Sequence, residues 1–185
     1  MKEIVLTKNY IFYGIAIFLL FLLKFWYKNT SADDVGFLLK PVDEFISLIT
    51  NSNSIFTKET GYFHKKLNIY IDKSCSGFNL WIIATMLFIF QFVTFLKKDL
   101  NKILAIIFSF FIGYIFTIIV NTFRIYTAII FKNISIFEAN SKFTHEFIGA
   151  IINLTFLILA YTFIQKIINK NNYEKFASSK MEFNN

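Results

Sequence analysis

Residues 103–131, "ILAIIFSFFIGYIFTIIVNTFRIYTAIIF", show what kind of protein this chain is. This apolar run contains one charged side chain, Arg124. A helix crosses the roughly 30 Å hydrocarbon layer of a bilayer with about 20 residues, so the run is long enough to span a membrane. Of the 185 residues, 56% are apolar and 26 are phenylalanine, which is unusual for a soluble domain of this size. The sequence therefore predicts a membrane protein.

Three more apolar segments are long enough, or nearly so, to cross the membrane: residues 10–26, 78–96 and 147–168. The first resembles a signal peptide, but Lys24 interrupts its end and no good small-residue cleavage site follows, so we interpret it as a retained anchor. The predicted fold class is an all-α integral membrane protein of about four transmembrane helices. Residues 1–185 would form a single polytopic membrane domain that ends in a flexible cytoplasmic tail at residues 169–185.

The distribution of basic residues predicts the orientation. Segments 1–9, 97–102 and 166–185 carry nine lysines in 35 positions, whereas loops 28–74 and 132–146 carry eight in 62, matched by eight acidic residues. Cytoplasmic segments are enriched in basic residues. We therefore expect both termini inside and the two larger loops outside. The net charge of +7 does not indicate a nucleic-acid partner, because the lysines form no basic stripe or binding motif.

The first outer loop has a pattern of its own. Pro41 is suited to the first position of a short helix, with acidic residues just after it, and we expect this helix to lie on the membrane. Its expected apolar face consists of Val42, Phe45, Ile46 and Ile49.

Farther along the same loop, Leu67, Ile69 and Ile71 alternate with polar residues, and Gly61 marks a turn before them. This pattern predicts a small β-hairpin that leads into "SCSG", residues 74–77.

Cys75 is the only cysteine in the chain, which excludes an intrachain disulfide, a four-cysteine zinc site and a CxxC pair. Taken alone, such a thiol is more often a packed side chain than a nucleophile. The topology adds a second observation. Cys75 precedes the second span, His145 precedes the fourth, and Arg124 lies about 32 Å along the third, so all three are expected at the outer interface.

Each of these residues also has a simpler interpretation. An arginine near the end of a span usually extends its charge to the headgroups. An interfacial histidine such as His145 is usually solvated, and His64, in the charged run "HKK", fits that description even better. A shared depth for Cys75, Arg124 and His145 is harder to explain in this way.

Together the three residues would suit acyl transfer. Cys75 would be the nucleophile, and His145 would take its proton and later give it to the leaving amine. Arg124 would donate to the oxyanion of the tetrahedral intermediate or hold a substrate carbonyl.

Three further residues are expected to support this chemistry. Ser74 is a candidate N-cap that would place Cys75 in the first turn of a helix. Asn121 lies three residues before Arg124 and would orient the guanidinium or donate a second hydrogen bond. Gly77 would let a substrate backbone approach the thiol.

Other catalytic patterns fit less well. "HEFIG" begins like the zinc motif HExxH, but Gly149 stands where the second histidine is needed. The chain has no GxSxG elbow and no paired intramembrane aspartates. We therefore expect no metal site and no cofactor.

"SCSG" at Cys75, "NTFR" at residues 121–124 and "HE" at His145, followed by Gly149, together resemble the exosortase/archaeosortase family. The resemblance covers about residues 67–161, and the chain is most similar to the compact bacterial type called exosortase K. It implies a membrane cysteine transpeptidase with Cys75, Arg124 and His145 as its catalytic residues.

The resemblance also implies partners and a location. The substrates would be membrane-anchored exported proteins whose C-terminal sorting signal is cleaved, with transfer to a surface glycan or lipid acceptor. The enzyme would lie in the bacterial inner membrane, with its active site outside the cytoplasm. The alternative from the residues themselves is a non-catalytic membrane protein, such as a transporter or a complex subunit, with a polar cavity lined by Arg124 and His145.

Overall fold

The structure is a computed structural model that describes the backbone of residues 2–96, 99–132 and 141–182, and side chains within 9–96, 99–131 and 147–170. Its elements are, in chain order, α1 (Lys2–Lys28), α2 (Gly36–Thr50), β1 (Ser54–Thr57), β2 (Gly61–His64), β3 (Ile69–Ile71), a 3-10 turn η1 (Lys73–Cys75), α3 (Phe78–Phe95), α4 (Asp99–Lys132) and α5 (Ser141–Glu182).

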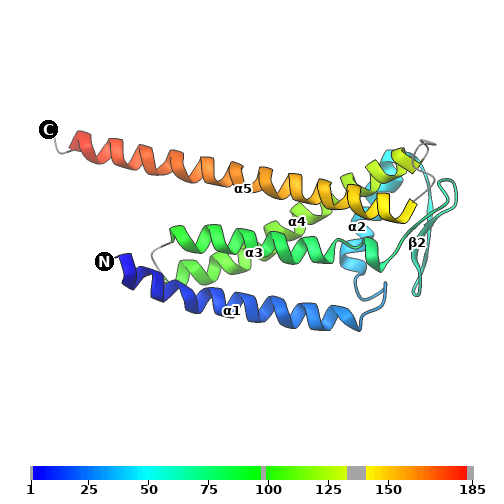
Figure 1. The fold of residues 1–185 in the computed structure, drawn as a ribbon, viewed down its shortest axis with the longest axis horizontal. Helices are drawn as coiled ribbons and strands as arrows, with labels where there is room; N and C mark the ends of the chain where they lie inside the picture. Colours follow the sequence, from blue (N-terminus) through cyan, green and yellow to red (C-terminus); the bar gives the residue numbers. More distant parts are fainter. Residues whose placement is uncertain (1, 97–98, 133–140, 183–185) are drawn as a thin grey trace.

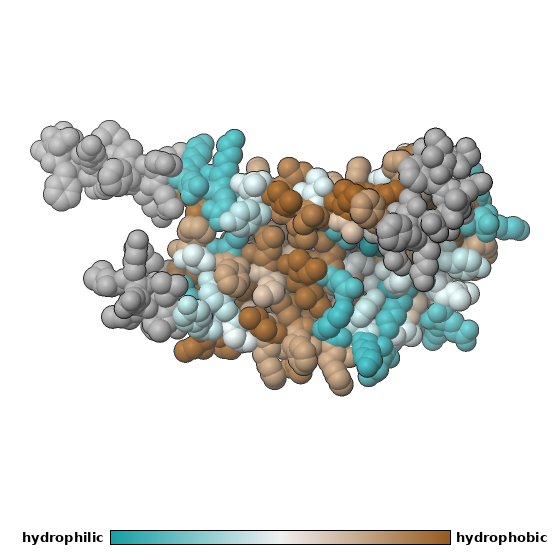
Figure 2. Space-filling view, in the orientation of Figure 1, coloured by the Kyte–Doolittle hydropathy of each residue, from teal (hydrophilic) through white to brown (hydrophobic). Residues whose placement is uncertain are grey.

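The predicted fold class is confirmed. Among the described residues, four helical segments are long and apolar enough to cross a membrane: Asn9–Lys28, Lys73–Phe95, Asp99–Phe131 and Phe147–Lys170. α1 begins and α5 ends at one end of the bundle, and the sheet lies at the other, which we call the sheet end (Figure 1). On the face shown in Figure 2, apolar side chains cover the middle of the bundle and polar ones gather toward its ends, as expected for a protein surrounded by lipid.

The expected outer-loop helix exists, but two details of it were wrong. α2 begins at Gly36, so Pro41 lies inside the helix. Proline cannot donate to the carbonyl four residues earlier. The hydroxyl of Tyr114 on α4 donates to that carbonyl, the one of Phe37, at 2.9 Å. This contact helps to explain how α2 tolerates its proline, and it holds α2 against α4.

The buried face of α2 also differs from the expected one. Val42 and Ile46 are buried as predicted, whereas Phe45 and Ile49 are about half exposed. The buried positions instead continue toward the start of the helix, at Leu38 and Leu39. The face is displaced because α2 packs across α4, a neighbour that the loop sequence does not reveal.

The expected hairpin is part of a three-stranded antiparallel sheet in the order β1-β2-β3. Tyr62 pairs with Phe56 on one side and with Ile71 on the other. Ile71 is buried and Tyr70 is exposed, in line with the predicted alternation. Leu67 lies in the turn before β3 and not in a strand. β3 ends directly before η1, so the sheet places the turn that carries Cys75.

α3 and α4 form the central pair of the bundle, and α1 and α5 pack on them. The indole N–H of Trp81 donates to the carbonyl of Phe110 at 3.2 Å, and the rings of Phe88 and Phe116 meet edge to face at 5.7 Å. α5 continues as a helix to Glu182, so the backbone of the expected tail is helical over most of its length. The flexibility of that tail stays a prediction.

Candidate active site

Cys75 ends the short turn η1 and lies two residues before the N-cap of α3. The carboxylate of Asp72 accepts the backbone N–H of Cys75 at 3.1 Å, and it also accepts the hydroxyl of Ser74 at 2.6 Å. The expectation for Ser74 was therefore wrong, because Asp72 caps the turn and Cys75 is not in the first turn of α3. Asp72 could have been recognised as a capping residue three positions before Cys75.

Gly77 is the N-cap of α3, and its φ of +73° is a left-handed conformation that favours glycine. A Cβ at this position would lie 3.0 Å from Cγ of Asn121 and 3.1 Å from Cγ2 of Thr117. The space beside Gly77 is thus filled by α4. The expected role in admitting a substrate backbone is not supported, since the glycine instead allows α3 and α4 to approach closely.

Asn121 is fully buried on α4, and its side-chain Nδ2 donates to the carbonyl of Cys75 at 2.6 Å. We expected this amide to orient the guanidinium of Arg124 or to donate a second hydrogen bond, and the contact found joins α4 to the main chain of the nucleophile turn. The Oδ1 atom of Asn121 is buried and accepts no hydrogen bond from the residues that the structure describes.

Arg124 lies one helical turn beyond Asn121, and its charge is within electrostatic reach of the Cys75 sulfur. Its side chain is partly buried, and its Nε has no acceptor among the described residues. Gly149 of α5 packs against it, because a Cβ there would lie 3.1 Å from Cδ of Arg124. This contact brings the beginning of α5 to Arg124.

His145 is part of α5, four residues before Gly149. Residues four apart lie on the same face of a helix. The side chain of His145 is outside the described residues, so its contacts with Cys75 and Arg124 stay a prediction. We call Asp72, Cys75, Asn121, Arg124 and Gly149 the Cys75 cluster.

His64 is fully buried, which corrects the expectation of a solvated residue. Its Nε2–H donates to Oδ1 of Asp43 at 2.8 Å, and in the neutral ring Nδ1 accepts the hydroxyl of Ser52 at 3.0 Å. Oδ2 of Asp43 accepts the hydroxyl of Ser54 at 2.8 Å. We call these four residues the His64 cluster. They resemble a serine triad in composition, but Ser52 and His64 are sealed from solvent, so the cluster fastens α2 to the sheet.

Sequence reasoning also missed Tyr27, whose hydroxyl lies beside η1. No local pattern could have found it, because the contact joins residues 46 apart in the chain.

The family model described as transmembrane exosortase matches residues 4–162 of the chain. No curated protein and no solved structure matches the chain. The matched segment contains all the residues of the Cys75 cluster, and also His145.

Proposed function

Because the chain belongs to the transmembrane exosortase family, whose members are membrane cysteine transpeptidases, we propose that Cys75, Arg124 and His145 are its catalytic residues. The observation that carries this proposal is the packing of Gly149 on Arg124, which lies one helical turn beyond Asn121, the residue that binds the carbonyl of Cys75. The helix that contains His145 therefore packs on Arg124, one helical turn from the residue that binds the main chain of the only thiol.

In the proposed reaction, Sγ of Cys75 attacks the scissile carbonyl carbon of the substrate, and His145 takes the thiol proton. N–H groups of Arg124 donate to the oxyanion that forms on the carbonyl oxygen. The C–N bond then breaks, the amine leaves with the proton from His145, and a thioester on Cys75 remains. A nucleophile of the acceptor attacks this thioester, and the thiol is regenerated when the acceptor's proton returns to it through His145.

The substrates in this proposal are exported proteins with a membrane-anchored C-terminal sorting signal. The acceptor is a surface glycan or lipid. The lysine distribution supports an orientation with both termini in the cytoplasm, in which the sheet end would lie on the outer side of the inner membrane. Cleavage would then occur where exported proteins emerge from the membrane.

The first test is Cys75→Ala, expressed in the cell that makes the natural precursor. The substitution removes one sulfur atom from a partly buried site, so the protein should still insert and fold. We expect precursor to accumulate and mature product to disappear, measured by immunoblot at equal membrane levels of both enzymes. Mature product at the normal rate would rule out thiol catalysis and favour the non-catalytic alternative.

A further inference from the structure

Tyr27 contacts the nucleophile turn at two points that lie on either side of Cys75. Its hydroxyl donates to the carbonyl of Lys73 at 2.8 Å and lies 3.3 Å from Oγ of Ser76. Because the phenol has one hydrogen, the second contact requires the Ser76 hydroxyl to donate to it. The Tyr27 ring stacks on Phe78, the first residue of α3, with centroids 4.1 Å apart.

Lys73 of η1 binds back to the end of α1. Its ammonium donates to the carbonyl of Thr30 at 2.6 Å and to that of Lys28 at 3.4 Å, where it caps the end of α1. It also lies 4.8 Å from the centroid of the Tyr27 ring, a cation–π contact. The end of the first span and the turn that carries the thiol are therefore tied to each other in both directions.

The thiol turn is held from two sides. Tyr27 of α1 binds the carbonyl two residues before Cys75, and Asn121 of α4 binds the carbonyl of Cys75 itself. Within the described part of the chain, the only hydrogen-bonding contact of the sulfur is the exposed Ser74 hydroxyl at 3.9 Å. The position of the sulfur thus depends on how its main chain is held.

We propose that Tyr27 is a positioning residue for the nucleophile: with Asn121, it fixes the main chain of the turn and thereby the position of the Cys75 sulfur. The proposal rests on the proposed function, because it takes Cys75 as the nucleophile. Tyr27 acts through the turn and needs no contact with the substrate. Nucleophilic attack depends on the alignment of the reacting atoms, so a small displacement of the sulfur is enough to slow it.

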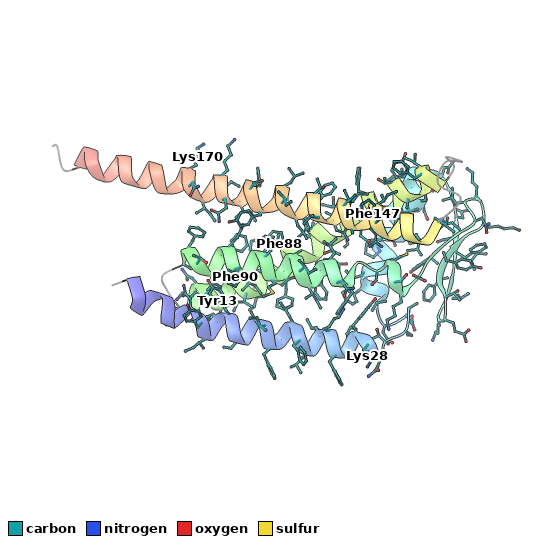
Figure 3. All side chains as sticks on the ribbon, in the orientation of Figure 1. Tyr13, Lys28, Phe88, Phe90, Phe147 and Lys170 are labelled. Carbon is teal, nitrogen blue, oxygen red and sulfur yellow. The ribbon has the colours of Figure 1, made fainter. Side chains whose placement is uncertain are left out.

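A second tyrosine on α1 provides a matched control. The ring of Tyr13 stacks on Phe90 of α3 at 4.3 Å, and its hydroxyl lies 2.9 Å from that of Thr94. Figure 3 shows Tyr13 and Phe90 in the half of the bundle nearer the termini. Both tyrosines thus join α1 to α3 by a ring stack, but the hydroxyl of Tyr13 contacts α3, whereas that of Tyr27 contacts the thiol turn.

The experiment compares Tyr27→Phe with Tyr13→Phe, since each loses a hydroxyl and keeps its ring stack. Cys75 is the only cysteine, so iodoacetamide labels a single site on the detergent-purified protein. We expect Tyr27→Phe to mature its precursor about 10-fold more slowly, because two hydrogen bonds to the turn are lost. The slower maturation should persist when the precursor is overexpressed, because a high substrate concentration compensates for a raised KM but not for a lowered kcat.

Alkylation should change in the opposite direction. Release of the turn exposes the partly buried thiol, so Tyr27→Phe should react about threefold faster with iodoacetamide, while Tyr13→Phe reacts like the wild type at a similar melting temperature. Ser76→Ala, which removes one of the two contacts, should show a smaller increase. This variant keeps the proposal testable if Tyr27→Phe is not recovered in folded form.

Equal alkylation rates in Tyr27→Phe and Tyr13→Phe would overturn the proposal, whatever happens to precursor maturation. Normal maturation in Tyr27→Phe would overturn it as well. The alkylation measurement needs no catalysis, so its outcome is independent of the Cys75→Ala test. Failure of that test removes the proposed function, whereas failure of the alkylation test removes only the role of Tyr27.

Discussion

The His64 cluster and the Cys75 cluster differ in how completely their polar groups are paired. Both ring nitrogens of His64 and both carboxylate oxygens of Asp43 have hydrogen-bond partners. In the Cys75 cluster, Oδ1 of Asn121 and Nε of Arg124 are buried and have no partner among the described residues. Unpaired buried polar groups are costly and are often retained for function.

The two clusters also differ in their access to solvent. His64 is sealed, whereas Cys75 is partly exposed at the end of its turn. A paired and sealed cluster can stabilise a fold but cannot reach a substrate. An incompletely paired and accessible one can bind or react. Substitutions in the Cys75 cluster should therefore lower activity more than stability, and substitutions in the His64 cluster should do the reverse.

The largest expected effect is that of Arg124→Lys. Lysine keeps the charge but loses the planar pair of donors that would bind an oxyanion. Loss of such a donor typically lowers turnover by about 100-fold to 1000-fold, so precursor should accumulate although the variant inserts normally. Lys28→Arg, at the exposed end of α1, is the control and should mature precursor normally. Full activity in Arg124→Lys would remove Arg124 from the mechanism.

The next effect concerns His64→Ala, which removes the donor to Oδ1 of the buried Asp43 carboxylate, while Oδ2 keeps the Ser54 hydroxyl. Leaving a buried acceptor atom unpaired costs about 1–3 kcal/mol, so the free energy of unfolding should fall by about that amount. Chemical denaturation in detergent measures it, with the exposed neighbour Lys65→Ala as the control. Precursor maturation per folded molecule should stay near the wild-type rate. A large loss of turnover without loss of stability would indicate a chemical role for the His64 cluster. It would contradict the conclusion that this cluster serves only stability.

The smallest expected effect is that of Asn121→Ala, which removes the donor to the Cys75 carbonyl. Loss of one buried hydrogen bond that aligns the nucleophile should slow maturation by about 10-fold. Gln91→Ala is the matched control, because this buried amide donates to the carbonyl of Tyr161 at 3.2 Å, away from the thiol. We expect it to affect stability only. Equal activity in the two variants would argue against a positioning role for Asn121.

Much of the architecture could be predicted because it depends on local properties of the chain. The membrane spans follow from the length of the apolar segments, and Ile71 and Tyr70 show the alternation expected of a strand. The errors arose where a segment meets a distant neighbour. The buried face of α2 is displaced toward Leu38 because the helix packs across α4, and His64 is buried because Asp43 and Ser52 surround it.

The candidate site likewise combines features that could be predicted from local sequence with contacts that could not. Cys75 and Arg124 could be proposed from their depth in the predicted topology, and the structure places them within electrostatic reach of each other. The roles of Asn121 and Gly77 could not be derived, because they depend on how α4 is rotated against α3. The catalytic role of His145 stays a prediction.

The sequence by itself determined the membrane class, the all-α fold with a small sheet, and the motifs around Cys75, Arg124 and His145 on which the resemblance to the family rests. These follow from local hydrophobicity and from residue order, which need no knowledge of neighbours. Only the tertiary structure decided that Asn121 and Tyr27 hold the thiol turn and that Asp43 and Ser52 enclose His64. Hydrogen-bond partners depend on the rotation and offset of packed elements, and no periodicity within one segment encodes those quantities.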